Sequence, residues 1–233
     1  MGRIVSFSFK SFDIDDRRCA MKVGTDAVVL GATATCDDAC TVVDIGAGSG
    51  IVALMIAQRC QADITAVEID HGAAQDCKAN FEASPWSDRL SVVCDSYDLF
   101  EPDSPVDLIV SNTPFFANGE LSPVAERAKA RHSAELSPCS LLDYAAGKLS
   151  DNGRLSMVIP YQQVDQIVYE AEMRRLKQRL QIDVRQRRNL DYVRSVVEFS
   201  LTDGKLERRQ ITICGDDGKR SPQFSEITRD FYL

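Results

Sequence analysis

The tetrapeptide Asn112-Thr113-Pro114-Phe115 places a side-chain amide, a peptide carbonyl and an aromatic ring directly after an apolar, strand-like run at 106–111. This set suits a planar amine, because Asn112 and the Thr113 carbonyl can accept its two hydrogens while Phe115 stacks on its face. Pro114 favours extended backbone at Thr113. Accepting both hydrogens localises a lone pair that an aromatic ring otherwise withdraws. These four residues are the predicted catalytic group, and they favour chemistry at an amine nitrogen.

A glycine loop, Asp44-Ile45-Gly46-Ala47-Gly48-Ser49-Gly50, follows another strand-like run at 41–45. Glycines at alternate positions let the backbone turn sharply and approach a ligand closely. Alone, the loop would also suit a nicotinamide dinucleotide. Together with the tetrapeptide it favours S-adenosylmethionine (SAM) as a methyl donor. The loop residues predicted to contact this cofactor are Gly46, Ala47, Gly48 and Gly50.

Acidic residues at strand ends support SAM further. Asp44 is suited to order water or an amino group beside a cationic amino-acid ligand. Glu68, near the end of the next strand, can accept both ribose hydroxyls, and Asp95, at the end of the third, can accept from an adenine amine. Such acids also serve as helix caps, and capping is the role expected for Asp70. The remaining predicted cofactor contacts are Ile69 and Asn112.

Length and composition limit the classes of protein to which this chain can belong. The chain has 233 residues, of which 44% are hydrophobic and 27% charged, so it can bury a full core as one domain. It has no apolar run near the roughly 18 residues of a membrane helix, and its start lacks a signal-peptide pattern. We expect a single domain over 1–233, with 1–35 an N-terminal extension and helix packed on it. We also expect a cytoplasmic monomer without membrane contact.

The cysteines are predicted to be structural. Eight occur without any C-x-x-C pair, and several lie in apolar runs, as Cys94 does in Leu90–Cys94. This pattern is typical of small core residues in a reducing compartment. We therefore expect no metal site.

The net charge of −8 is unevenly distributed. Residues 1–120 carry 8 Lys/Arg and 19 Asp/Glu, whereas residues 121–233 carry 19 and 16. The stretch 174–194, called the basic stretch below, holds eight basic and two acidic residues. A local basic face can bind a phosphate backbone on an acidic protein. A solvated face of a helix and hairpin explains these charges equally well.

Strands and helices alternate along the chain, which predicts an α/β fold with a parallel sheet and helices on both faces. A helix signal lies within Met21–Ala34, with Thr25 or Asp26 as the cap. The other expected helices are 49–60, 71–83, 137–150 and 161–178. The expected strands are 41–46, 63–69, 90–94, 106–111 and 154–160, followed by β-rich stretches at 180–186, 195–202 and 209–214.

Further motifs run nearly the length of the chain. The stretch Lys22–Asp26 within Arg18–Asp26 and the tripeptide Ser84-Pro85-Trp86 are more specific than the glycine loop. The others are Phe9-Lys10-x-Phe12, Ala66–Asp70, Val110–Phe116, Ala130-Arg131-His132 and Phe231-Tyr232-Leu233. With these motifs the chain resembles the class I SAM-dependent amino-methyltransferases, and more closely the bacterial tRNA adenine methyltransferases that modify adenosine 37 of a valine tRNA.

This resemblance implies a Rossmann-like sheet of seven mostly parallel strands with an antiparallel edge strand. It implies SAM as the cofactor, tRNA as the partner, and methyl transfer to the N6 amine of an adenosine in the anticodon loop. It also implies that Lys22, Gly24 and Thr25 line the methionine end of SAM. One departure concerns Thr113, because the family usually has proline there. Threonine still provides the peptide carbonyl, but it makes the loop less rigid than proline would. We therefore expect methyl transfer to persist at a lower rate.

Three hypotheses remain open. A tRNA methyltransferase would use the basic stretch, with Lys129, Arg131 and His132, to contact phosphates. A methyltransferase acting on a protein amide would need a narrow slot and no basic stripe. A module inactivated by the change at Thr113 would bind SAM without turnover.

Overall fold

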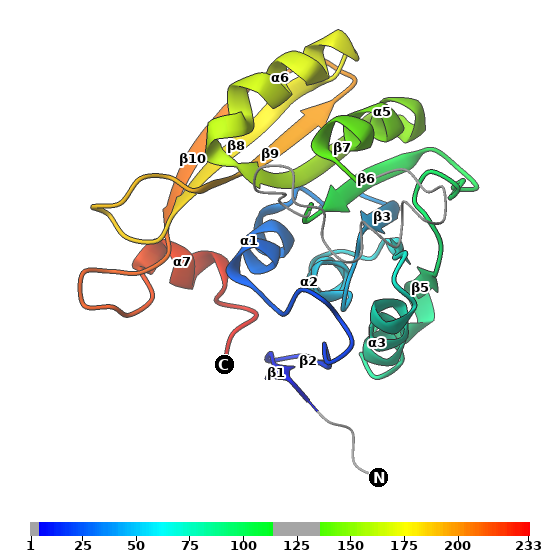
Figure 1. Cartoon of the computed structure of the whole chain (residues 1–233), viewed down its shortest axis with the longest axis horizontal. Helices are drawn as coiled ribbons and strands as arrows, with labels where there is room; N and C mark the ends of the chain where they lie inside the picture. The colour runs from blue at the N-terminus through cyan, green and yellow to red at the C-terminus, as the bar shows by residue number, and fades with distance from the viewer. Residues whose placement is uncertain (1–4, 114–135) are drawn as a thin grey trace.

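The computed structural model describes residues 5–113 and 136–233. The strands are β1 (Phe7–Ser8), β2 (Asp13–Ile14), β3 (Thr41–Ile45), β4 (Asp63–Val67), β5 (Leu90–Val93), β6 (Val106–Ser111), β7 (Leu149–Pro160), β8 (Lys177–Arg185), β9 (Arg194–Ser200) and β10 (Glu207–Thr212). The helices are α1 (Thr25–Thr33), α2 (Ile51–Arg59), α3 (His71–Glu82), α5 (Pro138–Lys148), α6 (Val164–Met173) and α7 (Pro222–Ile227), with short 3-10 turns η1 (Ser87–Arg89) and η2 (Tyr161–Gln163). Figure 1 shows α5 and α6 on one side of a large sheet and α1, α2 and α3 on the other.

The large sheet has the strand order β10-β8-β9-β7-β6-β3-β4-β5. All of its pairs are parallel except those of β9, which runs against both β7 and β8. The expected α/β fold of mostly parallel strands with one antiparallel strand is confirmed, but that strand, β9, was expected at the edge and lies inside the sheet. The described sheet has eight strands rather than seven. The hairpin β8–β9 inserts β9 between β7 and β8, and β10 then adds outside β8, so the reversed strand is covered rather than terminal.

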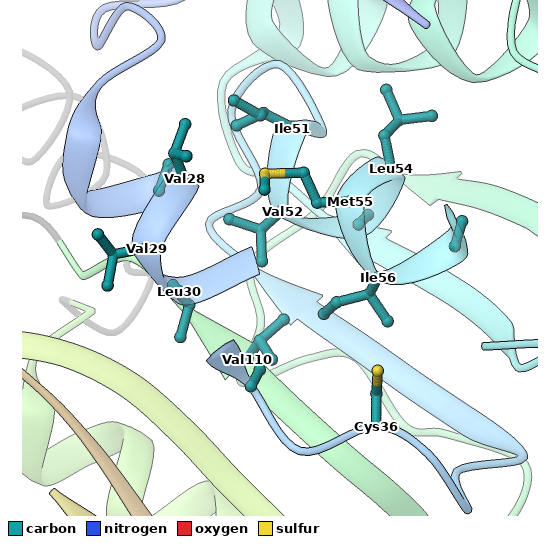
Figure 2. Packing of buried hydrophobic residues seen from close by; sticks show 14 of the residues in the cluster. Val28, Val29, Leu30, Cys36, Ile51, Val52, Leu54, Met55, Ile56 and Val110 are labelled. Carbon is teal, nitrogen blue, oxygen red and sulfur yellow. The ribbon is translucent and has the colours of Figure 1, made fainter. Parts of the chain in front are cut away.

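Both faces of the sheet are buried. Successive side chains of β6 point to opposite faces, so Leu108 and Val110 join the core beneath α1, α2 and α3, while Ile109 joins the core beneath α5 and α6. Figure 2 shows side chains of α1 and α2 gathered over Val110. Burial on both faces explains why the central strands appear in the sequence as nearly continuous apolar runs.

Two expected helix boundaries are wrong. The N-cap of α1 is Gly24, which makes no side-chain cap bond, so neither Thr25 nor Asp26 caps this helix. The helix expected at 161–178 ends at Met173, and β8 begins at Lys177. Arg175 adopts a left-handed φ of 63°, and the Leu176 N–H donates to the Ala171 carbonyl at 2.9 Å. This is a Schellman helix end with arginine where glycine is usual, so the sequence gives no stop signal.

The N-terminal hairpin packs against the other end of the chain. Phe9 stacks on Phe12 with ring centroids 4.6 Å apart, and on Tyr232 at 5.7 Å. The Lys10 N–H donates to the Phe231 carbonyl at 2.8 Å. The residues between this hairpin and α1 are therefore fixed from both sides before they reach the carboxyl edge of the sheet.

All eight cysteines are free. Four are buried, as expected for core thiols, but Cys40 and Cys94 are exposed, so the prediction was wrong for these two. Among the helices described, none is both long and apolar enough to cross a membrane. Within residues 5–113 and 136–233, no group of three or more His, Cys, Asp or Glu side chains could hold a metal ion.

Close contact between α1 and α2 gives a stability prediction. A Cβ built at Gly31 would lie 2.8 Å from both Cβ and Sδ of Met55, whereas one at Gly147, in α5, would meet nothing within 4 Å. Gly31→Ala should lower the free energy of unfolding by about 1–3 kcal/mol through overpacking. Gly147→Ala should raise it by about 0.5–1 kcal/mol, since alanine favours helix. Urea unfolding measures both, and a Gly31→Ala protein as stable as the parent would contradict the packing argument.

Candidate functional site

The carboxyl ends of the parallel strands meet at one edge of the sheet, where open α/β sheets bind ligands. The glycine loop follows β3, Glu68 follows β4, Asp95 lies just beyond β5, and Asn112 follows β6. Predicted site residues from four separate segments are thus brought to the same edge.

The glycine loop depends on left-handed backbone at Gly46, Gly48 and Gly50, whose φ values are 68°, 56° and 79°. Gly50 is the N-cap of α2, and a Cβ there would lie 2.6 Å from a ring carbon of Phe81. A Cβ built at Gly48 would meet nothing within 4 Å. The loop therefore packs tightly against α3 at Gly50. At Gly48 there is free space, so a ligand can approach the backbone there.

Glu68 fixes the position of this loop. One of its carboxylate oxygens accepts from the Gly48 N–H at 2.8 Å, and the other accepts from the Asp70 N–H at 2.8 Å. The side chain is only 8% exposed, and burial raises its pKa, while the two backbone donors act in the opposite direction. Each oxygen keeps lone-pair capacity for another donor. Asp70 caps α3 by accepting from the Ala73 N–H at 2.9 Å, which confirms its predicted capping role.

Asp44 lies beneath the loop and is only 1% exposed. One carboxylate oxygen accepts from the Ala53 N–H at 3.2 Å, in the first turn of α2. Desolvation by burial raises the pKa of Asp44 to about 7. A cation near the loop would favour the ionised form of this carboxyl.

The other predicted cofactor residues differ in exposure. Asp95 is exposed, and its carboxylate accepts from the Ser96 N–H at 2.7 Å. Ile69 is half-buried. Ala47 is buried, and its N–H donates to the Val67 carbonyl at 3.3 Å. Asp95 and Ile69 are thus accessible at this edge, whereas Ala47 presents mainly backbone.

Lys22 organises the segment that leads into α1. Its ammonium donates to the carbonyls of Asp16, Cys19 and Arg17 at 2.6, 3.1 and 3.2 Å. The Asp16 carboxylate in turn accepts from the Val23 N–H at 3.0 Å. Lys22 therefore ties together the turn before Gly24 and Thr25, both of which are exposed.

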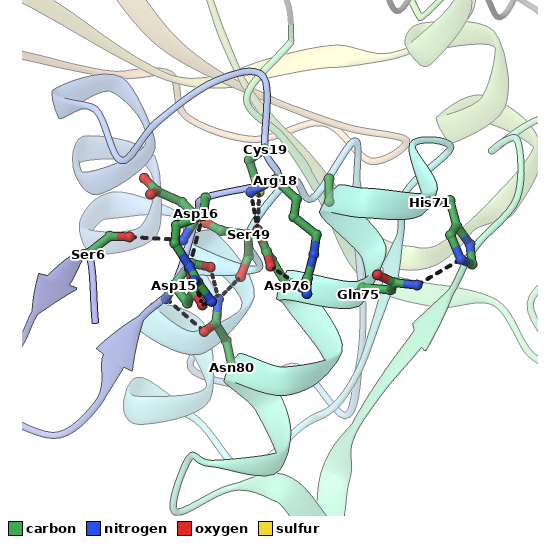
Figure 3. Close-up of polar contacts among 12 residues, drawn as sticks. Ser6, Asp15, Asp16, Arg18, Cys19, Ser49, His71, Gln75, Asp76 and Asn80 are labelled. Carbon is green, nitrogen blue, oxygen red and sulfur yellow. Dashed lines mark hydrogen bonds and ion pairs between the residues drawn. The ribbon is translucent and has the colours of Figure 1, made fainter. Parts of the chain in front are cut away.

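Two polar residues of α3 anchor this same segment, and the sequence argument missed both (Figure 3). The Asn80 amide accepts from the Asp15 N–H and donates to the Asp15 carbonyl, each at 2.9 Å, and also donates to the Ser49 carbonyl at 2.8 Å. Asp76 accepts from the backbone and guanidinium of Arg18 at 2.6 and 2.7 Å. Asn80 thus joins the N-terminal segment to the glycine loop. The available signal was polar residues one helical turn apart on a face shared with apolar ones.

Hydroxyl groups fix the end of β6 on both sides. Ser111 donates to the Ile45 carbonyl of β3 and Thr113 donates to the Val158 carbonyl of β7, each at 2.8 Å. Asn112 lies between them. Its buried Oδ1 has no hydrogen-bond partner among the described residues. A buried amide oxygen without a donor is costly in a folded protein, so this atom points to a ligand.

Pro114 and Phe115 of the predicted catalytic group lie outside the described residues, as do Lys129, Arg131 and His132. The half of the tetrapeptide that the structure describes places one hydrogen-bond acceptor, the Asn112 side chain, at the carboxyl edge of the sheet.

The structure divides the basic stretch into two parts. Arg174 pairs with Asp143 at 2.7 Å and Glu170 at 2.6 Å, and Arg194 pairs with Asp26 at 3.3 Å. Arg187 and Arg188, by contrast, are exposed in the loop between β8 and β9. The ion-paired arginines stabilise contacts within the protein, whereas Arg187 and Arg188 fit either hypothesis, a solvated face or a phosphate-binding face.

These residues fit SAM. The Glu68 carboxylate contacts the loop at Gly48, Asp44 precedes the loop, and Asp95 lies at the same edge of the sheet. This concentration of acidic groups suits a ligand with a sulfonium and an ammonium group. The open space at Gly48 allows the close approach that a nucleoside needs.

Comparisons with known proteins show the family to which the chain belongs. The family model for the methyltransferase small domain matches residues 21–183. A relative from Tolumonas auensis is 38% identical, with 98% of this chain and 97% of the relative covered, and one from Aeromonas hydrophila is 39% identical, with 100% and 99% covered. Both are named tRNA1(Val) (adenine(37)-N6)-methyltransferase.

Solved structures share the fold. A predicted O-methyltransferase from Agrobacterium tumefaciens matches with a TM-score of 0.69 at 20% identity, covering 88% of this chain and 96% of that one. A glycopeptide N-methyltransferase complexed with SAM matches with a TM-score of 0.57 at 13% identity, covering 79% and 96%. A glycine loop with acids at the ends of the following strands thus occurs in a SAM-dependent methyltransferase fold. The chain belongs to the methyltransferase small domain family and, within it, to the family of its tRNA1(Val) (adenine(37)-N6)-methyltransferase relatives.

Proposed function

We propose that this chain, acting as a single domain, transfers the methyl group of SAM to the exocyclic N6 amine of adenosine 37 in the anticodon loop of a valine tRNA. The observation that carries the proposal is the buried Oδ1 of Asn112 at the end of β6, which has no hydrogen-bond partner within residues 5–113 and 136–233. The choice of tRNA and position rests on the names of the relatives.

SAM, when bound, would supply an electrophilic methyl group on a sulfonium: the N6–CH3 bond would replace the S–CH3 bond, S-adenosylhomocysteine would leave, and the methylated nitrogen would lose one proton to solvent. The protein then needs no strong base before attack, because the adenine amine is neutral and carries the nucleophilic lone pair. Asn112 Oδ1 and the Thr113 carbonyl each accept one N6 hydrogen and localise that lone pair. Phe115 stacks on the base, and Pro114 favours extended backbone at Thr113. The main contribution of the site is alignment of the reacting atoms.

The cofactor roles are part of the same proposal. Glu68 accepts from the ribose hydroxyls with the lone pairs that its two backbone donors leave free. Asp95, which is exposed just beyond β5, accepts from the adenine amine. Asp44 acts electrostatically from beneath the loop. Backbone at Gly46, Ala47, Gly48 and Gly50, with Ile69, Lys22, Gly24 and Thr25 around it, completes the cofactor contacts.

The first experiment is transfer of labelled methyl from SAM into total tRNA from a strain lacking the enzyme, followed by nucleoside analysis. We expect label in N6-methyladenosine. Asn112→Ala should lower kcat about 100-fold or more, as loss of a preorganised hydrogen-bonding group does, with a much smaller effect on SAM affinity. SAM binding without any label in tRNA would instead favour a protein-amide acceptor or an inactive module.

Thr113 gives a second test. Its hydroxyl bond to Val158 supplies a tether that a proline at this position would lack. Thr113→Val keeps the side-chain shape but removes the donor, so kcat should fall about tenfold for a loss near 1.4 kcal/mol. Thr113→Ser retains the hydroxyl and should stay within about threefold of the parent. Single-turnover methylation rates at saturating SAM measure both, and equal rates for the Val and Ser variants would contradict a positioning role.

The raised pKa of Asp44 predicts pH-dependent cofactor binding. A carboxyl with a raised pKa stabilises the free protein while it is neutral, and that contribution is lost as pH rises through about 7. A cationic ligand favours the ionised form, so binding should release a proton and SAM affinity should rise with pH through that window. Calorimetry in two buffers with different ionisation enthalpies measures the release.

Asp44→Asn should flatten this pH dependence, leaving only the part due to Glu68, whose pKa is also raised. The control is Asp95→Asn, at an exposed position, which should weaken binding without changing the pH dependence. Unchanged proton release in Asp44→Asn would show that Asp44 does not respond to the ligand.

A further inference from the structure

The loop between β8 and β9, residues 186–193, lies at the same edge of the sheet as Asn112. Both β7 and β8 pair antiparallel with β9, so their carboxyl ends point the same way as that of β6. Figure 1 shows the turn between β8 and β9 projecting beyond the sheet on that side. The Tyr161 N–H, just after β7, donates to the Val193 carbonyl at 3.2 Å, which joins this loop to the end of β7.

An aromatic pair lies at this junction. The rings of Tyr161 and Tyr192 have centroids 5.3 Å apart and an interplanar angle of 39°. The Arg185 guanidinium lies over the Tyr192 ring, 5.0 Å from its centroid. Tyr161 is 38% exposed, and Tyr192 is half-buried. Two aromatic rings backed by a cation thus remain accessible at the carboxyl edge.

The same loop carries positive charge and apolar surface. Residues 185–194 contain four arginines and one acid, Asp191. Arg187 and Arg188 are exposed, and Leu190 and Val193 are 49% and 47% exposed. The arginines of the stretch that form ion pairs, such as Arg174, stabilise the protein itself. Exposed aromatic and aliphatic groups therefore alternate with arginines in this loop, a combination that suits single-stranded nucleic acid.

This loop is also tied to the proposed cofactor site. Arg194, at the start of β9, pairs with Asp26 in the first turn of α1 at 3.3 Å. Asp26 adjoins Thr25, which is proposed to line the methionine end of SAM. A nucleic acid bound to the loop would therefore contact the same edge of the sheet as the proposed cofactor site.

We propose that Tyr161 and Tyr192 form a stacking platform for an unpaired RNA base that flanks the methylated adenosine, with Arg187 and Arg188 on the adjoining phosphates. Base stacking on aromatic rings tolerates any base, while arginines at phosphates give affinity that depends on salt. This inference rests on the proposed function and adds which residues bind the single-stranded part of the acceptor RNA.

The test measures binding of a fluorescein-labelled valine anticodon stem-loop by anisotropy, in the presence of S-adenosylhomocysteine. Tyr161→Leu and Tyr192→Leu should each weaken binding about tenfold, within the range for loss of one stacked base. Tyr161→Phe and Tyr192→Phe keep a ring and should bind like the parent. The matched control is Tyr169→Leu, because Tyr169 is an exposed tyrosine, 61% accessible, on α6.

The salt dependence of RNA affinity distinguishes the contribution of base stacking from that of phosphate contacts. Arg187→Ala and Arg188→Ala should each reduce the slope of log K against log salt by about 0.7, the value for one phosphate contact on a single strand. The tyrosine variants should weaken binding without changing that slope. Arg208→Ala, at an exposed arginine of β10, is the charge-matched control and should leave the slope unchanged. Thermal unfolding and SAM affinity of every variant establish that the fold and cofactor site are intact.

The outcomes distinguish this inference from the proposed function. If the parent methylates the stem-loop but the leucine variants bind it like the parent, the platform is wrong and the proposed function stands. If the parent neither binds nor methylates any RNA, both are wrong. Weaker binding in the leucine variants, restored in the phenylalanine variants, with an unchanged salt slope, supports the platform.

Discussion

The parallel register of the central strands is the constraint on which the site depends. Backbone hydrogen bonds fix β4, β3, β6 and β7 side by side and in the same direction, so each strand delivers its next residues to one edge. Glu68 and Asn112, more than forty positions apart in the sequence, become neighbours of one glycine loop for this reason. A shift of any strand by one residue would also turn its buried side chains to the opposite face. Burial of both faces therefore fixes the geometry of the site.

The sheet brings the segments of the site to one edge, and buried hydrogen bonds then fix the exact position of each segment. Asn80 satisfies both backbone groups of Asp15 and one of Ser49, and Ser111 and Thr113 fasten the end of β6 to its two neighbours. Each contact pairs a buried polar group that would otherwise destabilise the fold. Asn112 Oδ1 differs from Ser111 and Thr113 on either side of it, because it has no hydrogen-bond partner among the described residues. A buried acceptor of this kind at the carboxyl edge of the sheet is consistent with a ligand-binding role.

The sequence predicts much of this structure because apolar runs and their spacing report burial directly. Strands β3 to β6 lie within two residues of their expected bounds, and Asp70 caps α3 as predicted. What the sequence does not predict has two different causes. Arg175 ends α6 in a left-handed conformation that is normally marked by glycine. The Thr113 hydroxyl donates to the Val158 carbonyl, 45 positions away. A hydrogen-bond partner that comes from a distant segment produces no local pattern in the sequence. The roles assigned to the site residues remain predictions.

The packing of the N-terminal hairpin against residues 231–232 has a consequence for local opening of the fold. The Phe231 carbonyl and the Tyr232 ring complete the packing of the hairpin that leads to Asp15 and the turn around Lys22. Contacting segments of a protein tend to open as one cooperative unit. Loss of the contacts at residues 231–232 would therefore loosen the hairpin and, through it, the turn around Lys22.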